Sequence, residues 1–387
     1  MVLASDCVPF GGAVAVSRFP LLEPAQAPWI RPGAVIHEPN AQVDDLLARF
    51  AATIRERGFQ VAFDDGGVTA GRSMRAAMRD DADLVVIGRF AAFEQAAREM
   101  TATVAEGPSR GMPVLTAVGG HCVGQWLNFA GPGGAMLPPD MASLWRWWGP
   151  ERLYQDLALG VAEAETRRIA CGQRWLMVEG PEGAGLAYLP AGGKEVAARI
   201  PSYRHLDLRQ LAELSRSWDA LEMALGIAAI NAHYNRFDLD AEIGNGAQTF
   251  STVRGRVVVI GAFPGLAEVL PDPQVIEASP RPGEYPTVAM DTLLPGCAAA
   301  VVTSSTLVTR TLPRVLRLAQ GARVALVGAA TPLTPRLFSY GLEVAGGLIV
   351  DDPAGLAAAV EAGAQPRDFM RFGRYVHLKD GGRPAAG

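Results

Sequence analysis

Lysine is nearly missing from this sequence, and no basic stretch stands out. Its 387 residues include only two lysines, Lys194 and Lys379, so that the positive charge is almost all arginine. Acidic residues outnumber basic ones, 40 to 35, which gives a formal net charge of −5. Because nucleic-acid binding calls for a strongly basic face, we expect no nucleic-acid partner.

Cysteine and histidine are also scarce. The four cysteines (Cys7, Cys122, Cys171 and Cys297) lie far apart and form no CxxC pair. The five histidines never pair with each other or with cysteine at the spacing of helical metal ligands. These patterns exclude a local zinc or redox motif, and they favour reduced cysteines and a cytoplasmic location.

Long apolar segments and common catalytic signatures are missing as well. The charge-free stretch 111–139 is broken by Gly and Pro and contains His121 and Gln125, so it predicts no membrane span. The N-terminus does not resemble a secretory signal. There is no GxSxG elbow and no Walker A loop, since Lys194 is followed by Glu195 instead of Ser or Thr.

What is present is an alternation of apolar strands and amphipathic helices, typical of an α/β fold. The length suggests two or three domains, and we place the first at residues 30–149, as an α/β parallel-sheet domain. Its helix would start at an Asn40 cap and end at Gly58, and Trp145, Trp147 and Trp148 would close the domain. The expected strands are 34–36, 59–63, 84–88 and 113–118, with helices between them.

We predict that residues 150–250 form an α+β domain and that residues 251–380 form a Rossmann-like domain. In the α+β domain we expect a helix over 151–169, a hairpin of 174–178 with 184–189, and a helix capped by Ser217. Small residues such as Gly226 would let that last helix pack closely. The third domain should hold parallel strands at 257–261, 274–277, 299–302, 323–328 and 348–350, with a helix over 307–319.

Polar residues follow these strands at the edge where open α/β sheets bind ligands. Gly261 begins the first turn, Glu277 ends the second strand, and Thr303, Ser304, Ser305 and Thr306 follow the third. The hydroxyls would act as helix caps or would bind an anion. Glu277 would be solvated, or it would bind a ribose hydroxyl or another polar group of a ligand. A GxGxxG dinucleotide fingerprint is absent, because Pro264 interrupts the turn.

Several motifs, in the same order along the chain, resemble those of a known family. They include 226–235 (GIAAINAHYN), 257–264 (VVVIGAFP), 282–286 (PGEYP) and 327–335 (VGAATPLTP). Residues 153–379 resemble the putative heavy-metal chelation family. The resemblance implies an enolase-N-terminal-like α+β domain packed on a Rossmann-like domain, and a role in metal or cobalamin biology. The family often has His where this chain has Ala262.

Residues 33–148 are similar to a P-loop-related family that is associated with molybdenum transport, although the nucleotide loop is missing. The resemblance implies a binding or docking module rather than an NTPase. A third hypothesis is a scaffold whose exposed Trp145, Trp147 and Trp148 dock a partner. Burial of these aromatic residues in a domain interface would explain them as well.

We therefore predict a ligand-binding protein in metal or metal-cofactor homeostasis. Its ligand would be a small molecule, a metal ion or a metal oxyanion, with molybdenum the favoured element. The alternative is an enzyme that acts on a small anionic metabolite, with Glu277 as acid or base. Catalytic residues are not assigned, and homo-oligomerisation is left open. The predicted ligand contacts are Asn231, Asn235, Gly261, Glu277, Ser304, Ser305, Thr306 and Thr331.

Overall fold

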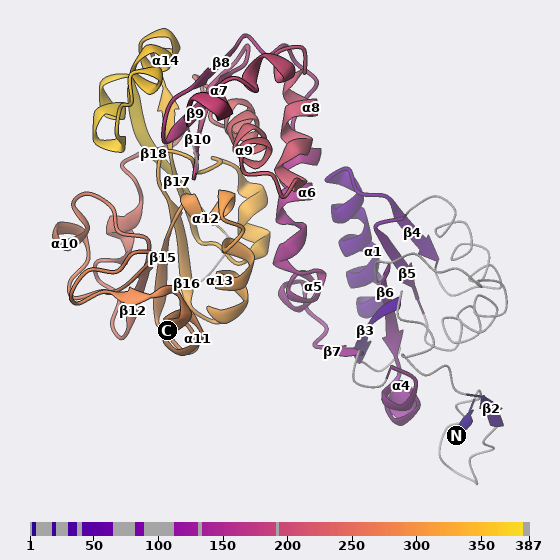
Figure 1. Cartoon of the computed structure of the whole chain (residues 1–387). Coiled ribbons are helices and arrows are strands. Elements are labelled where there is room, and N and C mark those ends of the chain that lie inside the picture. The colour runs from indigo at the N-terminus through magenta and orange to yellow at the C-terminus, as the bar shows by residue number, and fades with distance from the viewer. Residues whose placement is uncertain are drawn as a thin grey trace. The chain divides into compact units, whose positions relative to one another are not determined.

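The computed structural model describes residues 2–4, 18–20, 30–36, 41–64, 82–88, 112–130, 134–190 and 193–381. The chain divides into two compact units, residues 1–148 and 149–387 (Figure 1). The further division of the second unit at residue 250 stays a prediction. Among the described residues, no helix combines the length and the apolar character needed to cross a membrane.

A five-stranded parallel sheet forms the first unit, in the order β4-β5-β6-β3-β7. The apolar face predicted for the first helix is confirmed, since Phe50 and Ile54 are fully buried. The predicted Asn40 cap and the helices expected within 65–81 and 89–111 lie outside the described residues. The described elements of this unit are β1 (Val2–Ala4), β2 (Arg18–Pro20), β3 (Ile30–Ile36), α1 (Ala41–Glu56), β4 (Val61–Asp64), β5 (Leu84–Ile87), β6 (Met112–Val118), η2 (Gly120–Cys122), α4 (Val123–Ala130), β7 (Ala135–Leu137) and α5 (Met141–Trp148).

The tryptophans of α5 belong to the core of this unit. Trp145, Trp147 and Trp148 expose only 7%, 8% and 0% of their surface. The Trp148 ring meets Phe59 edge-on at 5.2 Å, and Trp145 meets Phe50 in the same way at 5.6 Å. The view that these tryptophans are exposed and dock a partner is therefore wrong.

The cysteine prediction also needs a correction. Cys122 is disulfide-bonded, whereas Cys171 and Cys297 are free thiols. Four reduced cysteines were expected because the sequence spacing shows no pair. Sequence separation does not limit which residues a fold brings together, so the spacing argument failed here.

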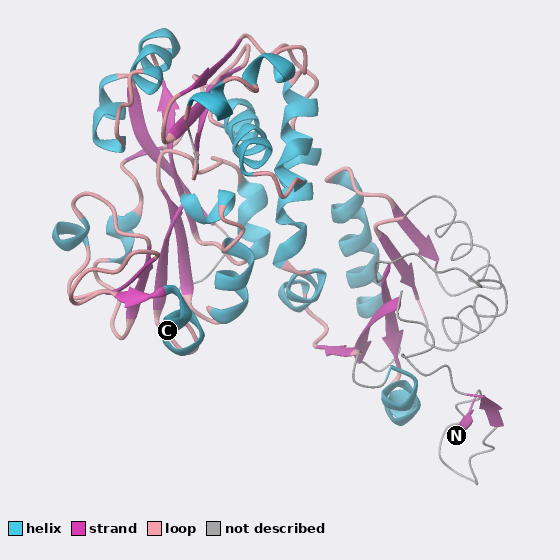
Figure 2. Ribbon diagram, viewed as in Figure 1, coloured by secondary structure: helices cyan, strands magenta, loops and turns pink. Residues whose placement is uncertain are grey.

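The second unit contains a three-stranded antiparallel sheet, in the order β10-β9-β8, and an eight-stranded mixed sheet (Figure 2). The predicted hairpin is confirmed, since β9 pairs with β10. The elements up to residue 250 are η4 (Pro150–Arg152), α6 (Leu153–Leu159), β8 (Arg168–Cys171), β9 (Trp175–Glu179), β10 (Ala184–Tyr188), α7 (Lys194–Ala197), η5 (Ile200–Tyr203), α8 (Leu208–Glu213), η6 (Leu214–Arg216), α9 (Ala220–Tyr234), β11 (Glu242–Ile243) and η7 (Ala247–Phe250).

Two helix predictions in this unit are wrong. The helix expected over 151–169 ends at Leu159, because residues 168–171 pair with β9 as an edge strand. Arg209 donates from Nη1 to the carbonyl oxygens of Leu159 and Val161, at 2.7 and 3.0 Å, and so satisfies groups that the short helix leaves open. The helix expected over 307–319 is two helices, because Arg310 has a left-handed φ of 57°.

All five strands predicted after residue 251 are present. Together with the short strand β14, which was not predicted, they form a parallel array in the order β14-β13-β12-β15-β16-β17, and β18 and β11 extend it in antiparallel pairing. The α/β fold class is thus confirmed. The elements are β12 (Val257–Ile260), α10 (Leu266–Val269), β13 (Gln274–Glu277), β14 (Tyr285–Pro286), η8 (Thr287–Ala289), α11 (Met290–Leu293), β15 (Ala299–Thr303), α12 (Ser305–Val308), α13 (Leu312–Leu318), β16 (Arg323–Val327), η9 (Pro335–Tyr340), β17 (Val344–Val350), α14 (Pro353–Glu361), η10 (Pro366–Arg371) and β18 (Gly373–Lys379).

Helix α9 is the central helix of this unit, and it is buried on all sides. It packs against β10 at Gly185, where a Cβ atom would lie 2.2 Å from the backbone nitrogen of Ala232. At Gly226 a Cβ atom would lie 2.1 Å from the backbone nitrogen of Ser215. The predicted role of Gly226 in close packing is therefore confirmed.

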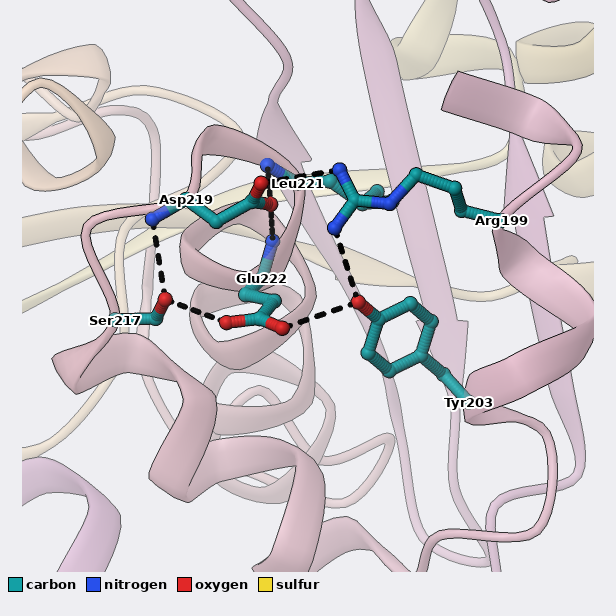
Figure 3. A network of polar contacts seen from close by, with 6 residues as sticks. All are labelled: Arg199, Tyr203, Ser217, Asp219, Leu221 and Glu222. Carbon is teal, nitrogen blue, oxygen red and sulfur yellow. Dashed lines mark hydrogen bonds and ion pairs between the residues drawn. The ribbon is translucent and has the colours of Figure 1, made fainter. Parts of the chain in front are cut away.

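The N-terminus of α9 is fixed by a polar network, which Figure 3 shows. The cap is Asp219 and not Ser217 as predicted, because the Asp219 carboxylate accepts from the backbone N–H groups of Leu221 and Glu222, both at 3.0 Å. Ser217 instead donates to Glu222 Oε2 at 2.5 Å. Arg199 completes the network with an ion pair to Asp219 at 3.0 Å.

Replacing Asp219 by alanine is expected to lower the free energy of unfolding by about 1 kcal/mol, the usual value of an N-cap. The hydrogen bond from Arg199 lowers the pKa of Asp219 below the ordinary value of 3.8. This stabilisation is therefore complete above that value and is lost as the pH falls below it. Urea unfolding at pH 7 and at pH 3 measures both effects, and an equal loss for Asp219→Ala at the two pH values would contradict them.

Candidate functional site

A cavity of about 470 Å³ lies at the carboxyl ends of the parallel strands of the second unit. The turns after β12, β13, β15 and β16 contribute to its lining, and so do residues of β9, β10, η10 and β18. The lining includes Trp175, Tyr188, Gly261, Ala262, Phe263, Glu277, Thr303, Ser304, Ser305, Gly328, Arg367 and Tyr375.

The turn after β12 is held tightly against the end of β15. Gly261 has a φ of 85°, and a Cβ atom there would lie 2.1 Å from Thr303 Oγ1. Thr303 Oγ1 donates to the Ile260 carbonyl at 2.9 Å and lies 3.0 Å from Ser305 Oγ. Glycine at 261 therefore satisfies both the backbone conformation and the close approach.

Glu277 ends β13 and faces the cavity. Its Oε1 accepts from the backbone N–H of Ala262 at 2.5 Å, and its Oε2 from that of Ala278 at 3.2 Å. Within the described ranges, no arginine, lysine or histidine forms an ion pair with Glu277. The carboxylate is therefore fixed in place by backbone donors and keeps free acceptor positions.

Ser304 and Ser305 differ in their surroundings. Ser304 exposes only 3% of its surface, and its Oγ accepts from the backbone N–H of Ala330 at 3.3 Å. The absence of a side chain at Gly328 leaves the room for Ser304, since a Cβ atom there would lie 2.6 Å from Ser304 Oγ. Ser305 contacts only the Thr303 hydroxyl among the hydrogen bonds of its own side chain that involve described residues. Ser305 is thus the better placed to contact a ligand.

Aromatic side chains form another part of the lining, the aromatic wall. Trp175 and Tyr188 are a cross-strand pair of the hairpin, with ring centroids 6.0 Å apart and edge-on geometry. Phe369 packs edge-on against Trp175, with ring centroids 5.1 Å apart. Burial raises the pKa of Tyr375 to about 12, so its hydroxyl remains protonated at neutral pH and can donate a hydrogen bond.

Arg367 is the positive charge of the cavity, and Glu277 is the negative one. The Arg367 side chain is exposed, and no described residue forms an ion pair or hydrogen bond with its guanidinium. A guanidinium that no carboxylate neutralises attracts an anion, and its planar donors suit a carboxylate or an oxyanion.

Of the eight predicted contact residues, the structure brings four to the cavity: Gly261, Glu277, Ser304 and Ser305. The other four are buried away from its lining. Asn231 donates to the carbonyls of Leu186 and Ala330, at 2.7 and 3.0 Å. The remaining three are Asn235 and Thr331, both fully buried, and Thr306, which donates to the Thr303 carbonyl at 2.7 Å.

The sequence reasoning missed the aromatic wall and Arg367. A signal for Trp175 and Tyr188 was present, because the predicted hairpin pairs two aromatic residues at its open end. Arg367 and Tyr375 come from segments that no pattern in the sequence connects with the sheet edge. Their place in the cavity depends on how β18 folds back beside β17.

The donor set does not fit a bare heavy-metal cation. In the parts of the chain that the structure describes, no three residues of the types His, Cys, Asp and Glu gather closely enough to hold a metal ion. The cavity lining contains Glu277 but neither His nor Cys. Soft transition metals require several nitrogen or sulfur ligands, so this chain's described residues alone do not supply a tight cation site.

The chain adds β13 and β14 on one side of β12 and then β15, β16 and β17 on the other, and the cavity lies at the carboxyl ends beside this reversal. This arrangement defines an α/β protein with a Rossmann-like domain. Two family models described as putative heavy-metal chelation match residues 154–234 and 249–379. A third, described as a protein of unknown function, matches residues 63–147. Through its second unit the chain belongs to the putative heavy-metal chelation family.

The chain is also similar to solved structures of proteins with unknown function. A protein of the DUF364 family from Desulfitobacterium hafniense is 28% identical, with a TM-score of 0.55, over 59% of this chain and 98% of its own. Another DUF364 family protein, from Pyrococcus horikoshii, is 20% identical with a TM-score of 0.49, over 62% of this chain and 100% of its own.

A curated relative bears on a short part of the chain. Over 83 residues the chain is 34% identical to the molybdenum import ATP-binding protein ModC 2 of Bradyrhizobium diazoefficiens. The matching segment is 21% of this chain and 9% of that protein, so the chain spans less than a tenth of the relative's length.

Proposed function

We propose that the second unit binds a small anionic ligand in its cavity, as part of metal or metal-cofactor homeostasis. The observation that carries this proposal is Arg367, a guanidinium without a carboxylate partner among the described residues, in the lining of a preformed cavity to which Ser305 also belongs. The family descriptions point to metal chemistry. A metal would then arrive within a ligand that brings its own donor atoms, as an oxyanion or an organic complex.

Molybdate is the oxyanion that we favour. The name of the curated relative supports molybdenum, and hydroxyl and guanidinium donors suit a tetrahedral oxygen anion. Such a ligand needs hydrogen-bond donors rather than soft metal ligands, which agrees with the composition of the cavity.

Binding is therefore expected to prefer anions to cations. Calorimetric titration of the full chain with molybdate, tungstate, phosphate and sulfate, beside zinc, nickel and cobalt, measures the preference. Because hydrogen bonds to a charged group contribute about 1.5–3 kcal/mol, Arg367→Gln should weaken anion binding by about tenfold or more, and Ser305→Ala by less. The exposed Arg204, replaced by Gln, is the matched control. Tight binding of a cation, with an affinity that neither Arg367→Gln nor Ser305→Ala changes, would contradict the proposal.

The second candidate is an enzyme that acts on a small anionic metabolite in the same cavity. The observation in its favour is Glu277, a carboxylate held by two backbone N–H groups and open to the ligand. No nucleophile and base pair accompanies it among the described lining residues, so binding is the better supported function. Consumption of the bound ligand by the wild-type chain, measured by mass spectrometry, would favour the enzyme.

Ala262 offers a direct test of cation binding. Its backbone N–H donates to Glu277 Oε1, so a histidine side chain at this position would bring an imidazole close to a carboxylate. We expect Ala262→His to gain weak calorimetric binding of nickel or zinc that the wild-type chain lacks, because an imidazole and a carboxylate are two donors where the wild type has one, still fewer than a tight site needs. Ala262→Phe controls for side-chain size. Equal nickel binding by the wild type and both variants would contradict this reading of the cavity.

A further inference from the structure

The cavity lies where the direction of the chain through the sheet reverses. From β12 the chain proceeds outward to β13 and β14, and then returns to add β15, β16 and β17 on the other side. In folds with this strand order, a ligand binds at the carboxyl ends beside the central strand, and an acid at the end of the second strand contacts ribose hydroxyls. Glu277 ends β13, the second strand.

The Glu277 carboxylate has unoccupied acceptor positions, which hydroxyl groups of a ligand could fill as donors. The backbone N–H groups of Ala262 and Ala278 occupy one acceptor position on each oxygen, at 2.5 and 3.2 Å. A carboxylate has about four such positions, so about two remain for a ligand. Two adjacent hydroxyls on one sugar ring match two acceptors fixed a short distance apart.

The rest of the cavity suits the other parts of the same kind of molecule. Trp175, Tyr188 and Phe263 provide aromatic surface for a flat ring. Arg367 and Ser305 provide donors for an anionic group such as a phosphate. The turn from Gly261 to Gly265 contains Pro264, which lacks a backbone N–H, so it is poorly suited to hold the pyrophosphate of a dinucleotide.

We propose that the ligand belongs to the nucleoside class: a flat base against the aromatic wall, a ribose whose vicinal hydroxyls donate to Glu277, and at most one phosphoryl group beside Arg367. This inference rests on the proposed function, since it names the ligand class of the same cavity. The cavity volume of about 470 Å³ is within the range of small-molecule sites.

The experiment compares ribonucleosides with analogues that lack the diol. Adenosine, guanosine, cytidine and uridine, their 5′-monophosphates, and the matching 2′,3′-dideoxynucleosides are titrated into the full chain by calorimetry. We expect at least one ribonucleoside to bind, and its dideoxy analogue to bind about tenfold or more weakly, because hydrogen bonds to a charged carboxylate are lost.

Two variants test whether Glu277 is the residue that contacts the ribose hydroxyls. Glu277→Gln should remove most of the difference between the ribonucleoside and its dideoxy analogue, because the amide retains fewer acceptor positions. The exposed Glu163, replaced by Gln, should leave that difference unchanged. If Glu277→Gln does not fold, as judged by circular dichroism, the comparison of the two ligand series on the wild-type chain remains decisive.

Each other outcome identifies what has failed. Equal binding of ribonucleosides and dideoxynucleosides overturns the contact between Glu277 and a diol. If no nucleoside or nucleotide binds while an oxyanion binds in a manner that depends on Arg367, the nucleoside class is wrong and the proposed function stands. If neither group of ligands binds, both the inference and the proposed function are overturned.

Discussion

Replacing Asp156 by alanine is expected to lower the free energy of unfolding by about 3–5 kcal/mol, the usual effect of removing one partner of a buried ion pair. Asp156 is fully buried on α6. Its Oδ1 accepts from Arg336 Nη1 at 2.6 Å, and its Oδ2 from the Tyr340 hydroxyl at 2.8 Å. The substitution leaves a largely buried guanidinium without its carboxylate, in the contact between α6 and η9.

Urea unfolding of the full chain, followed by circular dichroism, measures this effect. The control is Asp291→Ala, which breaks an ion pair with Arg314 whose two side chains are 58% and 52% exposed. Exposed pairs contribute about 0–1 kcal/mol, so the control should unfold close to the wild type. Similar unfolding midpoints for the two variants would show that the Asp156 pair does not hold the unit together.

Asn235→Ala is expected to lower the free energy of unfolding by about 3 kcal/mol or more, since each buried polar group that loses its partner costs about 1–3 kcal/mol. The amide of Asn235 donates to the carbonyls of Thr331 and Leu348, at 3.0 and 3.1 Å. It also accepts from the backbone N–H of Leu333 at 2.8 Å. One side chain thus joins the end of α9 to the loop after β16 and to β17.

The same unfolding measurement tests this prediction, with the exposed Gln173, replaced by Ala, as control. The sequence suggested that Asn235 contacts a ligand, and the two roles give different results. A structural role lowers stability and alters binding only through folding. Weaker ligand binding by Asn235→Ala, at wild-type stability, would instead support a contact with the ligand.

The parallel strands could be predicted from the sequence because each is a short apolar run with a turn behind it. Val257–Ile260 and Arg323–Val327 are such runs, and the structure buries them almost completely. Edge strands lack this signature. Tyr285–Pro286 and Arg168–Cys171 take their conformation from pairing with a neighbour, which no local pattern shows.

Helix limits were harder to predict because tertiary contacts decide them. Arg310 interrupts the helix expected over 307–319, and its guanidinium donates to the carbonyls of Ser215 and Ser217, at 3.0 and 2.6 Å. The Trp218 ring lies under the same guanidinium at 4.5 Å. Residues nearly a hundred positions away thus fix this bend, beyond the reach of a local pattern.

The cavity was predictable only where the strand rule applied. Strand ends pointed to Gly261, Glu277, Ser304 and Ser305, and the structure places all four in the lining. Asn231 was grouped with them because an amide near a helix end suggests a polar cleft. Its amide instead satisfies backbone carbonyls of β10 and of the loop after β16, an arrangement that depends on how α9 packs.

The burial of α9 has a consequence for hydrogen exchange. Eleven of its fifteen residues are buried, and Gly185 and Gly226 bring neighbouring backbone into direct contact with it. Solvent can then reach the amide protons in the middle of this helix only when the surrounding structure opens as a whole. The slowest-exchanging amides of the second unit should therefore lie in α9, where their exchange rates would report the global opening of that unit under native conditions.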